Sequence, residues 1–295
     1  MVKKSSPTPT SIPVRIWLRD AAEMLASAGI PSALLDAEII LAHTLRKSRT
    51  WLHAHSDDSI SLRELEIANA RLDLRLDRTP VAYIIGHKEF YGRRFLVSPS
   101  VLIPRPESET LITLLQGLTL QNYNSLEEKT EAKKRRVVLF DVGTGSGCLG
   151  ITAKLEHPEL HVFLIDISRH ALVVAQKNAD ILRADVSIVT NDLLTPHSGL
   201  PAHADIIVAN LPYVDREWER SPETRHEPSI ALFADRHGLA LIDKLLQQSA
   251  SYLSPAGHLV LEADPSQHHH IIEKARLFGY EHRATDGYCI VFSYR

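Results

Sequence analysis

Cysteine, long apolar runs and surplus positive charge are all scarce in this chain of 295 residues. The two cysteines, Cys148 and Cys289, are too few for a disulfide framework, and such sparse usage is typical of the reducing cytoplasm. No apolar run is long enough to span a membrane. The first residues, Met1-Val-Lys-Lys, lead into Ser, Thr and Pro instead of the apolar core of a signal peptide. We therefore expect a cytoplasmic protein without a membrane segment.

The charge balance and the histidine pattern exclude two further classes of site. The formal net charge is −3 and the pI is about 6.6, whereas proteins that grip nucleic acid through its phosphates usually carry a basic face. We therefore expect no stable nucleic-acid binding. The run 268–270 is His-His-His, but neighbouring helix positions face different directions and no Cys, Asp or Glu is spaced to complete a site. We expect no bound metal.

A glycine-rich segment follows an apolar strand in the middle of the chain. Residues 141–147 read Asp-Val-Gly-Thr-Gly-Ser-Gly, and alternating glycines at a strand end let the backbone approach a cofactor closely. Residues 145–150 also match the G-x-G-x-x-G pattern of dinucleotide-binding enzymes. Asp166, which ends the next strand, suits the ribose diol of a dinucleotide and of S-adenosylmethionine equally. The glycine segment alone therefore leaves both cofactors open.

The tetrapeptide Asn210-Leu211-Pro212-Tyr213 favours methyl transfer from S-adenosylmethionine to a planar nitrogen. It follows the apolar strand 204–209, and a hydride-transfer enzyme has no evident use for it. An amide or exocyclic NH2 must be held by acceptors that face its two N–H bonds. The Asn210 side-chain oxygen and the Leu211 carbonyl can supply these acceptors, with the Tyr213 ring over the planar group.

Segments upstream of the glycine loop carry a closer resemblance. Residues 79–92 read Thr-Pro-Val-Ala-Tyr-Ile-Ile-Gly-His-Lys-Glu-Phe-Tyr-Gly, and residues 101–109 read Val-Leu-Ile-Pro-Arg-Pro-Glu-Ser-Glu. With the two motifs above, the chain resembles the HemK/PrmC family, over nearly its whole length. The resemblance implies an enzyme that methylates the side-chain amide nitrogen (N5) of the Gly-Gly-Gln glutamine in peptide chain release factors, with S-adenosylmethionine as cofactor. We expect a monomer.

The motifs and the resemblance together define the expected site. For catalysis we expect Asn210, Pro212 and Tyr213. For cofactor binding we expect Gly143, Thr144, Gly145, Ser146, Gly147, Asp166, Asp192, Leu193 and Asn210, with Asp192 as acceptor for the adenine amino group. For substrate binding we expect Leu102, Arg105, Asn210, Leu211, Pro212 and Tyr213. The prolines on either side of Arg105 restrict its backbone, and its side chain can face the substrate or form a salt bridge at a domain interface.

One departure from the family pattern keeps a second substrate open. The family has proline where this chain has Leu211, and Asn-Leu-Pro-Tyr also resembles the motif of ribosomal RNA adenine dimethyltransferases. Residues 261–264, Leu-Glu-Ala-Asp, lie where the family commonly has Glu-Ile-Gly. The alternatives are therefore an N6-adenine methyltransferase acting on ribosomal RNA and a non-catalytic cofactor-binding homologue.

The chain is long enough, with 44% hydrophobic residues, for one α/β domain and a smaller helical domain. We expect a disordered tail over 1–14 and a helical bundle over 15–78. The resemblance implies that the bundle recognises the release factor, and the alternative is a packing accessory without that role. The spacing of apolar residues ends one helix at Gly29, and Ser61-Leu-Arg-Glu64 is typical of a capping box. A hairpin and connector then occupy 79–118, with strands over 83–90 and 95–97, and an exposed polar connector occupies 119–136.

The remaining segment, 137–295, alternates strands and helices in the manner of a parallel sheet. We expect a class I S-adenosylmethionine-dependent methyltransferase fold, which is a Rossmann-like α/β domain with a seven-stranded mixed sheet. The strands are expected at 137–142, 161–167, 186–190, 204–209, 258–262, 280–285 and 288–292. Ligands in such sheets bind outside the carboxyl ends of the strands, which is where the glycine loop, Asp166, Asp192 and Asn210 fall.

Overall fold

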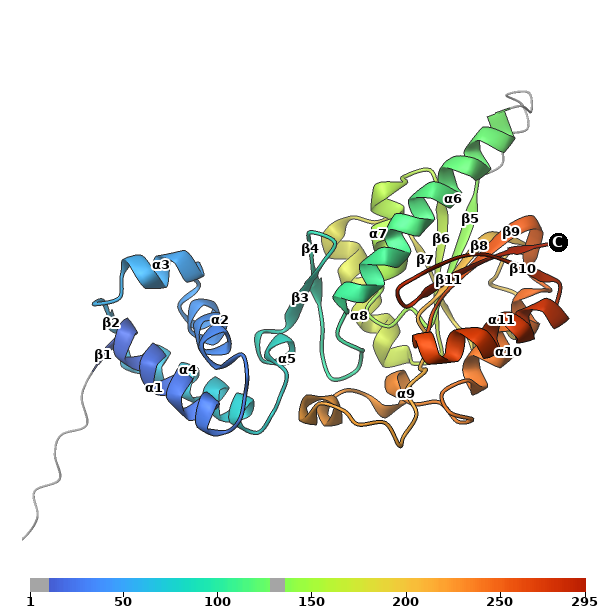
Figure 1. The fold of residues 1–295 in the computed structure, drawn as a ribbon. Helices are drawn as coiled ribbons and strands as arrows, with labels where there is room; N and C mark the ends of the chain where they lie inside the picture. The colour runs from blue at the N-terminus through green and yellow to red at the C-terminus, as the bar shows by residue number, and fades with distance from the viewer. Residues whose placement is uncertain (1–10, 128–135) are drawn as a thin grey trace, which may run out of the picture. The chain divides into compact units, whose positions relative to one another are not determined.

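The protein is described by a computed structural model over residues 11–127 and 136–295 (Figure 1). The chain divides into two compact units, residues 1–86 and 87–295, which we call the N-terminal unit and the C-terminal unit. Of the expected disordered tail, residues 1–10 lie outside the described residues. Beyond them, β1 (Ile12–Pro13) is paired and α1 begins at Val14, so the tail expected over 1–14 extends too far.

The N-terminal unit is built mainly of helices around one apolar core. After β1, its elements are α1 (Val14–Ser27), α2 (Ala33–Leu45), α3 (Arg49–Ala54), β2 (Ser59–Ile60), α4 (Leu62–Leu76) and α5 (Val81–Ile85). The expectation of helices alone is wrong at one point, because β1 pairs with β2 and sets Ile12 opposite Ile60. The Ile60 side chain is buried in the helical core, and this burial accounts for the short strand pair.

The helix boundaries in the N-terminal unit follow the expected capping chemistry. Ser61 accepts a hydrogen bond from the Glu64 amide, and Glu64 accepts one from the Ser61 amide, so the capping box is confirmed at the start of α4. Gly29 follows α1 with φ of 71°, a conformation that glycine adopts without steric penalty. Inside the core, Arg75 Nε donates to Asp36 Oδ2 over 2.7 Å, which satisfies a buried charged pair.

The C-terminal unit begins with a hairpin that is shorter than expected. Its strands are β3 (His87–Phe90) and β4 (Arg93–Leu96), which pair antiparallel. The residues from Val81 to Ile85 form helix α5 instead of a strand, because Pro80 caps the helix start and Gly86 ends it with φ of 76°.

The other elements of the C-terminal unit alternate as expected. They are η1 (Pro106–Ser108), α6 (Glu109–Glu127), β5 (Val138–Val142), α7 (Cys148–Glu156), β6 (His161–Asp166), α8 (Arg169–Leu182), β7 (Ser187–Thr190), β8 (Ala204–Ala209), η3 (Pro222–His226), α9 (Ser229–Leu232), α10 (Ala240–Ser249), β9 (Leu253–Glu262), η4 (Pro265–Gln267), α11 (His268–Leu277), β10 (Tyr280–Asp286) and β11 (Cys289–Tyr294).

Helix α6 changes the picture of the connector expected over 119–136. The helix continues to Glu127, so residues 119–127 are helical, and residues 128–135 lie outside the described part of the chain. Residues 119–127 are mostly polar, which suggested a connector, but they continue a helix whose first turns already pack on the core. Leu111, Ile112 and Leu115 supply these contacts to the core.

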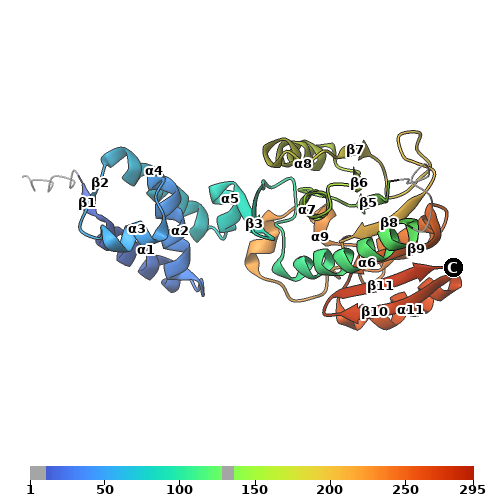
Figure 2. The same ribbon diagram turned by 90° about the horizontal axis from the view of Figure 1, so that it is seen from above.

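Within the described residues, seven strands form one mixed sheet in the order β10-β11-β9-β8-β5-β6-β7. Figure 2 shows this order from β7 beside α8 to β10 beside α11. Strands β5 to β9 are parallel, and β11 is antiparallel to both β9 and β10. The strand order reverses between β5 and β8, and ligands in doubly wound sheets bind at such a switch point. The expected Rossmann-like fold is confirmed.

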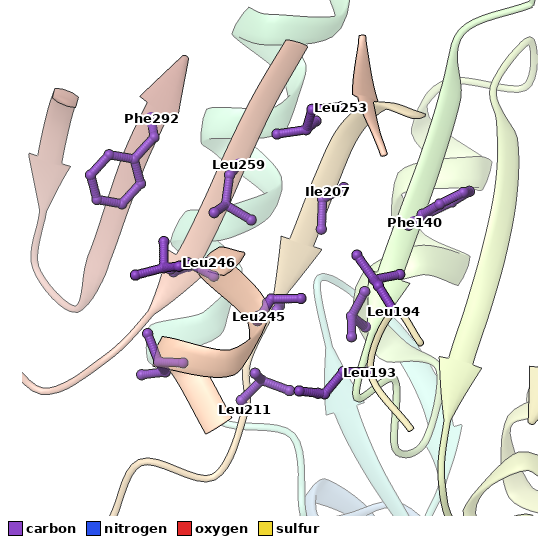
Figure 3. Close-up of a cluster of buried hydrophobic side chains, with 14 of the residues drawn as sticks. Phe140, Leu193, Leu194, Ile207, Leu211, Leu245, Leu246, Leu253, Leu259 and Phe292 are labelled. Carbon is purple, nitrogen blue, oxygen red and sulfur yellow. The ribbon is translucent and has the colours of Figure 1, made fainter. Parts of the chain in front are cut away.

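Successive side chains of each strand point to opposite faces of the sheet, and each face packs against an apolar core. Leu139 and Ile206 face a core that contains α6, α7 and α8, whereas Phe140 and Ile207 face a core that contains α10 and α11. Figure 3 shows the second core, in which Leu211 lies beside Leu193 beyond the strand ends. No helix in the described residues is long and apolar enough to cross a membrane.

Candidate active site

A cavity of about 200 Å³ opens beyond the carboxyl ends of β5, β6, β7 and β8. Most residues expected from the sequence line it: Leu102, Arg105, Gly143, Thr144, Gly145, Ser146, Asp166, Asp192, Leu193, Asn210, Leu211 and Pro212. Two expected residues, Gly147 and Tyr213, are not among the described residues that line it. The strand ends therefore bring the glycine loop and the Asn210 turn to one cavity.

The glycine loop takes a backbone conformation that favours glycine. Gly143, Gly145 and Gly147 have φ of 75°, 56° and 82°. A Cβ atom added at Gly145 would meet nothing within 4 Å, so the loop backbone is open to a ligand there. A Cβ atom at Gly150 would lie 2.3 Å from Leu164 Cδ2, so Gly150 permits close packing of α7 on β6. Gly147 and Gly150 thus shape the loop rather than line the cavity.

Asp141 is buried beneath the loop and joins its two ends. Its Oδ2 accepts hydrogen bonds from Thr144 Oγ1 at 2.5 Å and from the Gly150 amide at 2.9 Å. Its Oδ1 is buried without a hydrogen-bond partner among the described residues. Burial raises the pKa of Asp141 to about 6. Asp141 therefore links Thr144 in the glycine loop to Gly150 at the start of α7 and fixes the loop conformation.

Asp166 stands at the end of β6 and contacts the loop from the other side. Its Oδ2 accepts from the Gly145 amide at 2.9 Å, and its Oδ1 accepts from the Ser168 amide at 2.8 Å. Burial raises the pKa of Asp166, although these backbone donors oppose the shift. Each carboxylate oxygen can accept further bonds, so the pair of ribose hydroxyls has acceptors at this position.

The segment after β7 supplies a mixed polar and apolar wall. Asp192 Oδ2 accepts from Lys244 Nζ at 2.6 Å, which leaves its other oxygen for a ligand amino group. Leu193 takes φ of 50° and buries its side chain in the core against the cavity floor. Together these residues suit an adenine ring, since the leucine contributes an apolar surface and the carboxylate an acceptor.

The Asn210 turn is held by groups that lie outside the tetrapeptide. Asn210 Nδ2 donates to Ser108 Oγ at 3.0 Å, and Tyr213 Oη donates to Glu262 Oε1 at 3.2 Å. The Tyr213 ring packs against the hydrophobic core. Tyr213 is thus fixed against the core and is not among the described residues that line the cavity, and its packing on a substrate amide stays a prediction.

Leu211 has a packing role that its position in the motif did not suggest. Its side chain is 3% exposed and packs in the core, and a Cβ atom at Gly143 would lie 2.8 Å from Leu211 Cδ2. The leucine therefore joins the turn after β8 to the glycine loop after β5. Packing of the leucine side chain therefore restricts the turn.

Arg105 forms a salt bridge within the C-terminal unit. Its Nη2 donates to Glu227 Oε1 at 2.5 Å, and Glu227 Oε2 accepts from the Ile103 amide at 3.1 Å. Glu227 is buried, whereas the Arg105 side chain is 36% exposed and lines the cavity. Arg105 thus forms an ion pair and also lines the cavity. Its partner, Glu227, belongs to the C-terminal unit, so this ion pair does not join the two units.

Gln267 is a supporting residue that sequence reasoning did not identify. Its Nε2 donates to the carbonyl oxygens of Tyr213 and His237, each over 2.8 Å. A Cβ atom at Gly238 would lie 1.8 Å from the Tyr213 carbonyl oxygen, so the two backbones touch. Ser108, Glu227 and Glu262 were likewise given no role in the expected site, although residues 261–264 were noted for their departure from the family pattern.

No group of three or more His, Cys, Asp or Glu that could hold a metal ion occurs over residues 11–127 and 136–295. Of the three adjacent histidines, His268 is buried with Nε2 at 3.1 Å from the Ala263 carbonyl, and His270 lies 3.4 Å from Asp243. His268 therefore packs the start of α11 against the end of β9, and His270 faces α10.

Two family descriptions match the chain. Residues 17–86 match the PrmC N-terminal domain, and residues 124–226 match the methyltransferase small domain. The first match ends at the boundary between the two units, and the second covers the glycine loop and the Asn210 turn.

Curated relatives extend the similarity over most of the chain. A release factor glutamine methyltransferase of Koribacter versatilis is 37% identical, and the alignment covers 83% of this chain and 86% of the relative. One of Deinococcus radiodurans is 34% identical over 91% of this chain and 92% of the relative. A bifunctional methyltransferase of Rickettsia felis is 33% identical over 83% of this chain and 50% of the relative. The chain therefore belongs to the release factor glutamine methyltransferase family.

Proposed function

We propose that this enzyme transfers the methyl group of S-adenosylmethionine to the side-chain amide nitrogen of the glutamine in the Gly-Gly-Gln motif of peptide chain release factors. The observation that carries the proposal is the shared cavity of the glycine loop and the Asn210 turn. The relatives named above carry this activity in their names. The activity supports translation termination.

The cavity residues suit S-adenosylmethionine. The open backbone at Gly145 would hold the methionine part, Asp166 the ribose hydroxyls, and Asp192 with Leu193 the adenine. The cofactor supplies the methyl group and, as a sulfonium, its own leaving group. The protein's contribution is alignment of the acceptor nitrogen with the methyl group.

Asn210 and the Leu211 carbonyl would hold the two N–H bonds of the glutamine amide, so that the nitrogen lone pair points at the methyl carbon. Pro212 lines the cavity and restricts Leu211 to extended geometry. No separate strong base is needed, because methylation makes the nitrogen acidic and its proton can then leave.

The test is to incubate the protein with methyl-labelled S-adenosylmethionine and a release factor, or with ribosomal RNA, and to locate the label. We expect it on the Gly-Gly-Gln glutamine. Label in adenine of the RNA, with the release factor unmodified, would support the alternative substrate. Cofactor binding without transfer to either would indicate a non-catalytic homologue.

Replacement of Asn210 tests the chemistry. We expect Asn210→Ala to reduce methyl transfer by a factor on the order of 1,000 or more, because an aligned acceptor acts mainly in the transition state. The affinity for S-adenosylmethionine, measured by calorimetry, should change much less. Near-normal turnover by this variant would contradict the proposed role of the asparagine.

A further inference from the structure

A chain of hydrogen bonds joins Asn210 to a buried carboxylate. Asn210 Nδ2 donates to Ser108 Oγ at 3.0 Å, and Ser108 Oγ donates to Glu262 Oε2 at 2.6 Å. Ser108 and Glu262 are each only 2% exposed. The three residues come from η1 and from the ends of β8 and β9, so segments far apart in the sequence meet at the cavity wall, which Ser108 and Asn210 line.

The chemistry of these groups sets the direction of the chain. An ionised carboxylate only accepts, so the Ser108 hydroxyl donates its single proton to Glu262. The Ser108 oxygen is then left with lone pairs only, and it must face the NH2 group of Asn210. The side-chain amide is therefore oriented with Oδ1 away from Ser108. Without this constraint the amide could turn over, because its oxygen and nitrogen have almost the same shape.

Glu262 also holds the other end of the tetrapeptide. Tyr213 Oη donates to Glu262 Oε1 at 3.2 Å. Burial, together with the nearby Glu262 charge, raises the pKa of Tyr213, so the tyrosine remains a hydroxyl that can donate. One carboxylate thus contacts the last residue of the turn through Tyr213, and the first residue both through Ser108 and directly at the Asn210 side chain.

We propose that Glu262 is a positioning residue which, through Ser108, orients the Asn210 amide so that Oδ1 faces the substrate amide, and polarises it. The inference rests on the proposed function, because the orientation matters only if Asn210 Oδ1 accepts from a substrate NH2. Hydrogen bonds in series strengthen one another, so the Glu262 charge increases electron density on Oδ1. That density stabilises the positive charge that develops on the nitrogen during transfer.

The orientation depends on the protonation of Glu262. Burial raises the pKa of Glu262, while hydrogen bonds from Ser108, Tyr213 and Asn210 oppose the shift. The groups that face it are Tyr213, Glu107, Cys148 and Cys289. Burial raises the pKa of both thiols to about 12, so they stay neutral. A protonated Glu262 would donate to Ser108, whose hydroxyl would then donate to Asn210 and favour the reversed amide.

The experiment measures methylation of a release factor by the full-length protein between pH 5 and 9, with calorimetry for S-adenosylmethionine. The variants are Glu262→Gln, Ser108→Ala and the double variant, with Glu107→Gln as control, since Glu107 is an exposed carboxylate of η1 beside Ser108. We expect kcat to fall about 10- to 100-fold in either single variant, with cofactor affinity within about twofold. Glu107→Gln should retain normal kcat at the pH values where Glu262 is ionised, because it removes only a nearby charge that raises the pKa of Glu262.

Two further readouts separate positioning from general damage. The double variant should be no slower than the slower single variant, because both act through Asn210. The wild type should lose kcat on the acid side as Glu262 protonates, and Glu262→Gln should lack that loss. Unchanged kcat in Ser108→Ala, which removes one oxygen atom, would overturn the proposal even if Glu262→Gln failed to fold. If the wild type did not methylate the release factor at all, the proposed function would fail instead.

Discussion

Asp141 shows how a single buried carboxylate can stabilise a loop and yet reduce the stability of the fold. Both of its hydrogen-bond donors reach the same oxygen, and its other oxygen has no partner among the described residues. The loop therefore needs one acceptor atom at this position and not a negative charge. Burial raises the pKa of Asp141 from 3.8 to about 6, which means that the folded protein binds this proton more tightly than the unfolded chain.

This arrangement predicts the effect of Asp141→Asn. The stabilisation from the raised pKa is complete below about pH 4 and is lost as the pH rises through about 6. Relative to the variant, the wild type should therefore lose up to about 3 kcal/mol between pH 4 and 7, at about 1.4 kcal/mol per pKa unit. Denaturant unfolding at several pH values measures the difference. A gap between the two proteins that does not change with pH would contradict the prediction.

Asp166 differs from Asp141 because its oxygens also face the cavity. Asp166→Ala removes a charge-assisted acceptor of two hydroxyls and also leaves the Gly145 amide unpaired. We expect the binding free energy of S-adenosylmethionine to weaken by on the order of 2–3 kcal/mol in calorimetry. Asp185→Ala, an exposed carboxylate away from the cavity lining, is the matched control. Binding of NAD, with none of S-adenosylmethionine, would reassign the site to a dinucleotide.

At the scale of elements, the sequence predicted the strands well because apolar runs and parallel-sheet burial coincide. The run Ile206-Ile207-Val208 is buried on both faces of the sheet, so the strand appears in the sequence as a continuous apolar run. Helix α5 was missed because its apolar residues also suit a strand, and the φ of Gly86 that ends it is not readable in advance.

The candidate site divides in a similar way. Strand-end motifs predicted the glycine loop and Asn210, since ligands in such sheets bind beyond strand ends. The supporting residues Ser108, Glu262 and Gln267 could not be assigned, because their partners at the site lie 30 or more residues away in the chain. Long-range pairing of polar side chains has no local pattern, and only the folded backbone brings them together.

Gly238, in the loop before α10, contacts the Tyr213 carbonyl of the tetrapeptide. A methyl group added at Gly238 should therefore reduce methyl transfer more than one added at a glycine without such a contact. Gly238→Ala places Cβ against the Tyr213 carbonyl, where Gln267 also donates, so the turn must shift. We expect methyl transfer to fall on the order of 100-fold, as for a displacement of about 1 Å. Gly287→Ala is the control, because its φ is also positive but its Cβ meets nothing within 4 Å.

Both glycine variants should lose about 1 kcal/mol of stability from the positive φ alone, and Gly238→Ala should lose more through the clash. Thermal unfolding of the two proteins beside the kinetic measurement separates these effects. Equal loss of activity in both variants would show that backbone strain, and not the Tyr213 contact, is responsible.

At the scale of the whole molecule, we expect the substrate to be recognised as a folded protein. A short free peptide with Gly-Gly-Gln should be methylated far less efficiently than an intact release factor, because remote contacts help to position the glutamine. We propose that residues 15–78 of the helical bundle supply such contacts. Comparison of kcat/KM for the two substrates tests this. Equal values would leave the bundle without a recognition role.

A change of the target side chain adds a stricter test of reach. Replacement of the release factor's glutamine by asparagine shortens the side chain by one methylene, and the reaction should nearly stop, because the amide no longer meets Asn210 and the methyl group together. Measurement of label in this release factor beside the unchanged one gives the ratio. Comparable labelling would contradict the proposed alignment.

The described residues that line the cavity all fall between positions 100 and 241, which lies wholly within the C-terminal unit. Substitutions in the N-terminal unit therefore leave every described lining residue of the cavity unchanged. On our proposal that residues 15–78 contact the substrate, substitutions there can alter the recognition of a protein partner while the cavity keeps its lining residues. A homologue that exchanged its N-terminal unit would inherit the methyl-transfer apparatus intact.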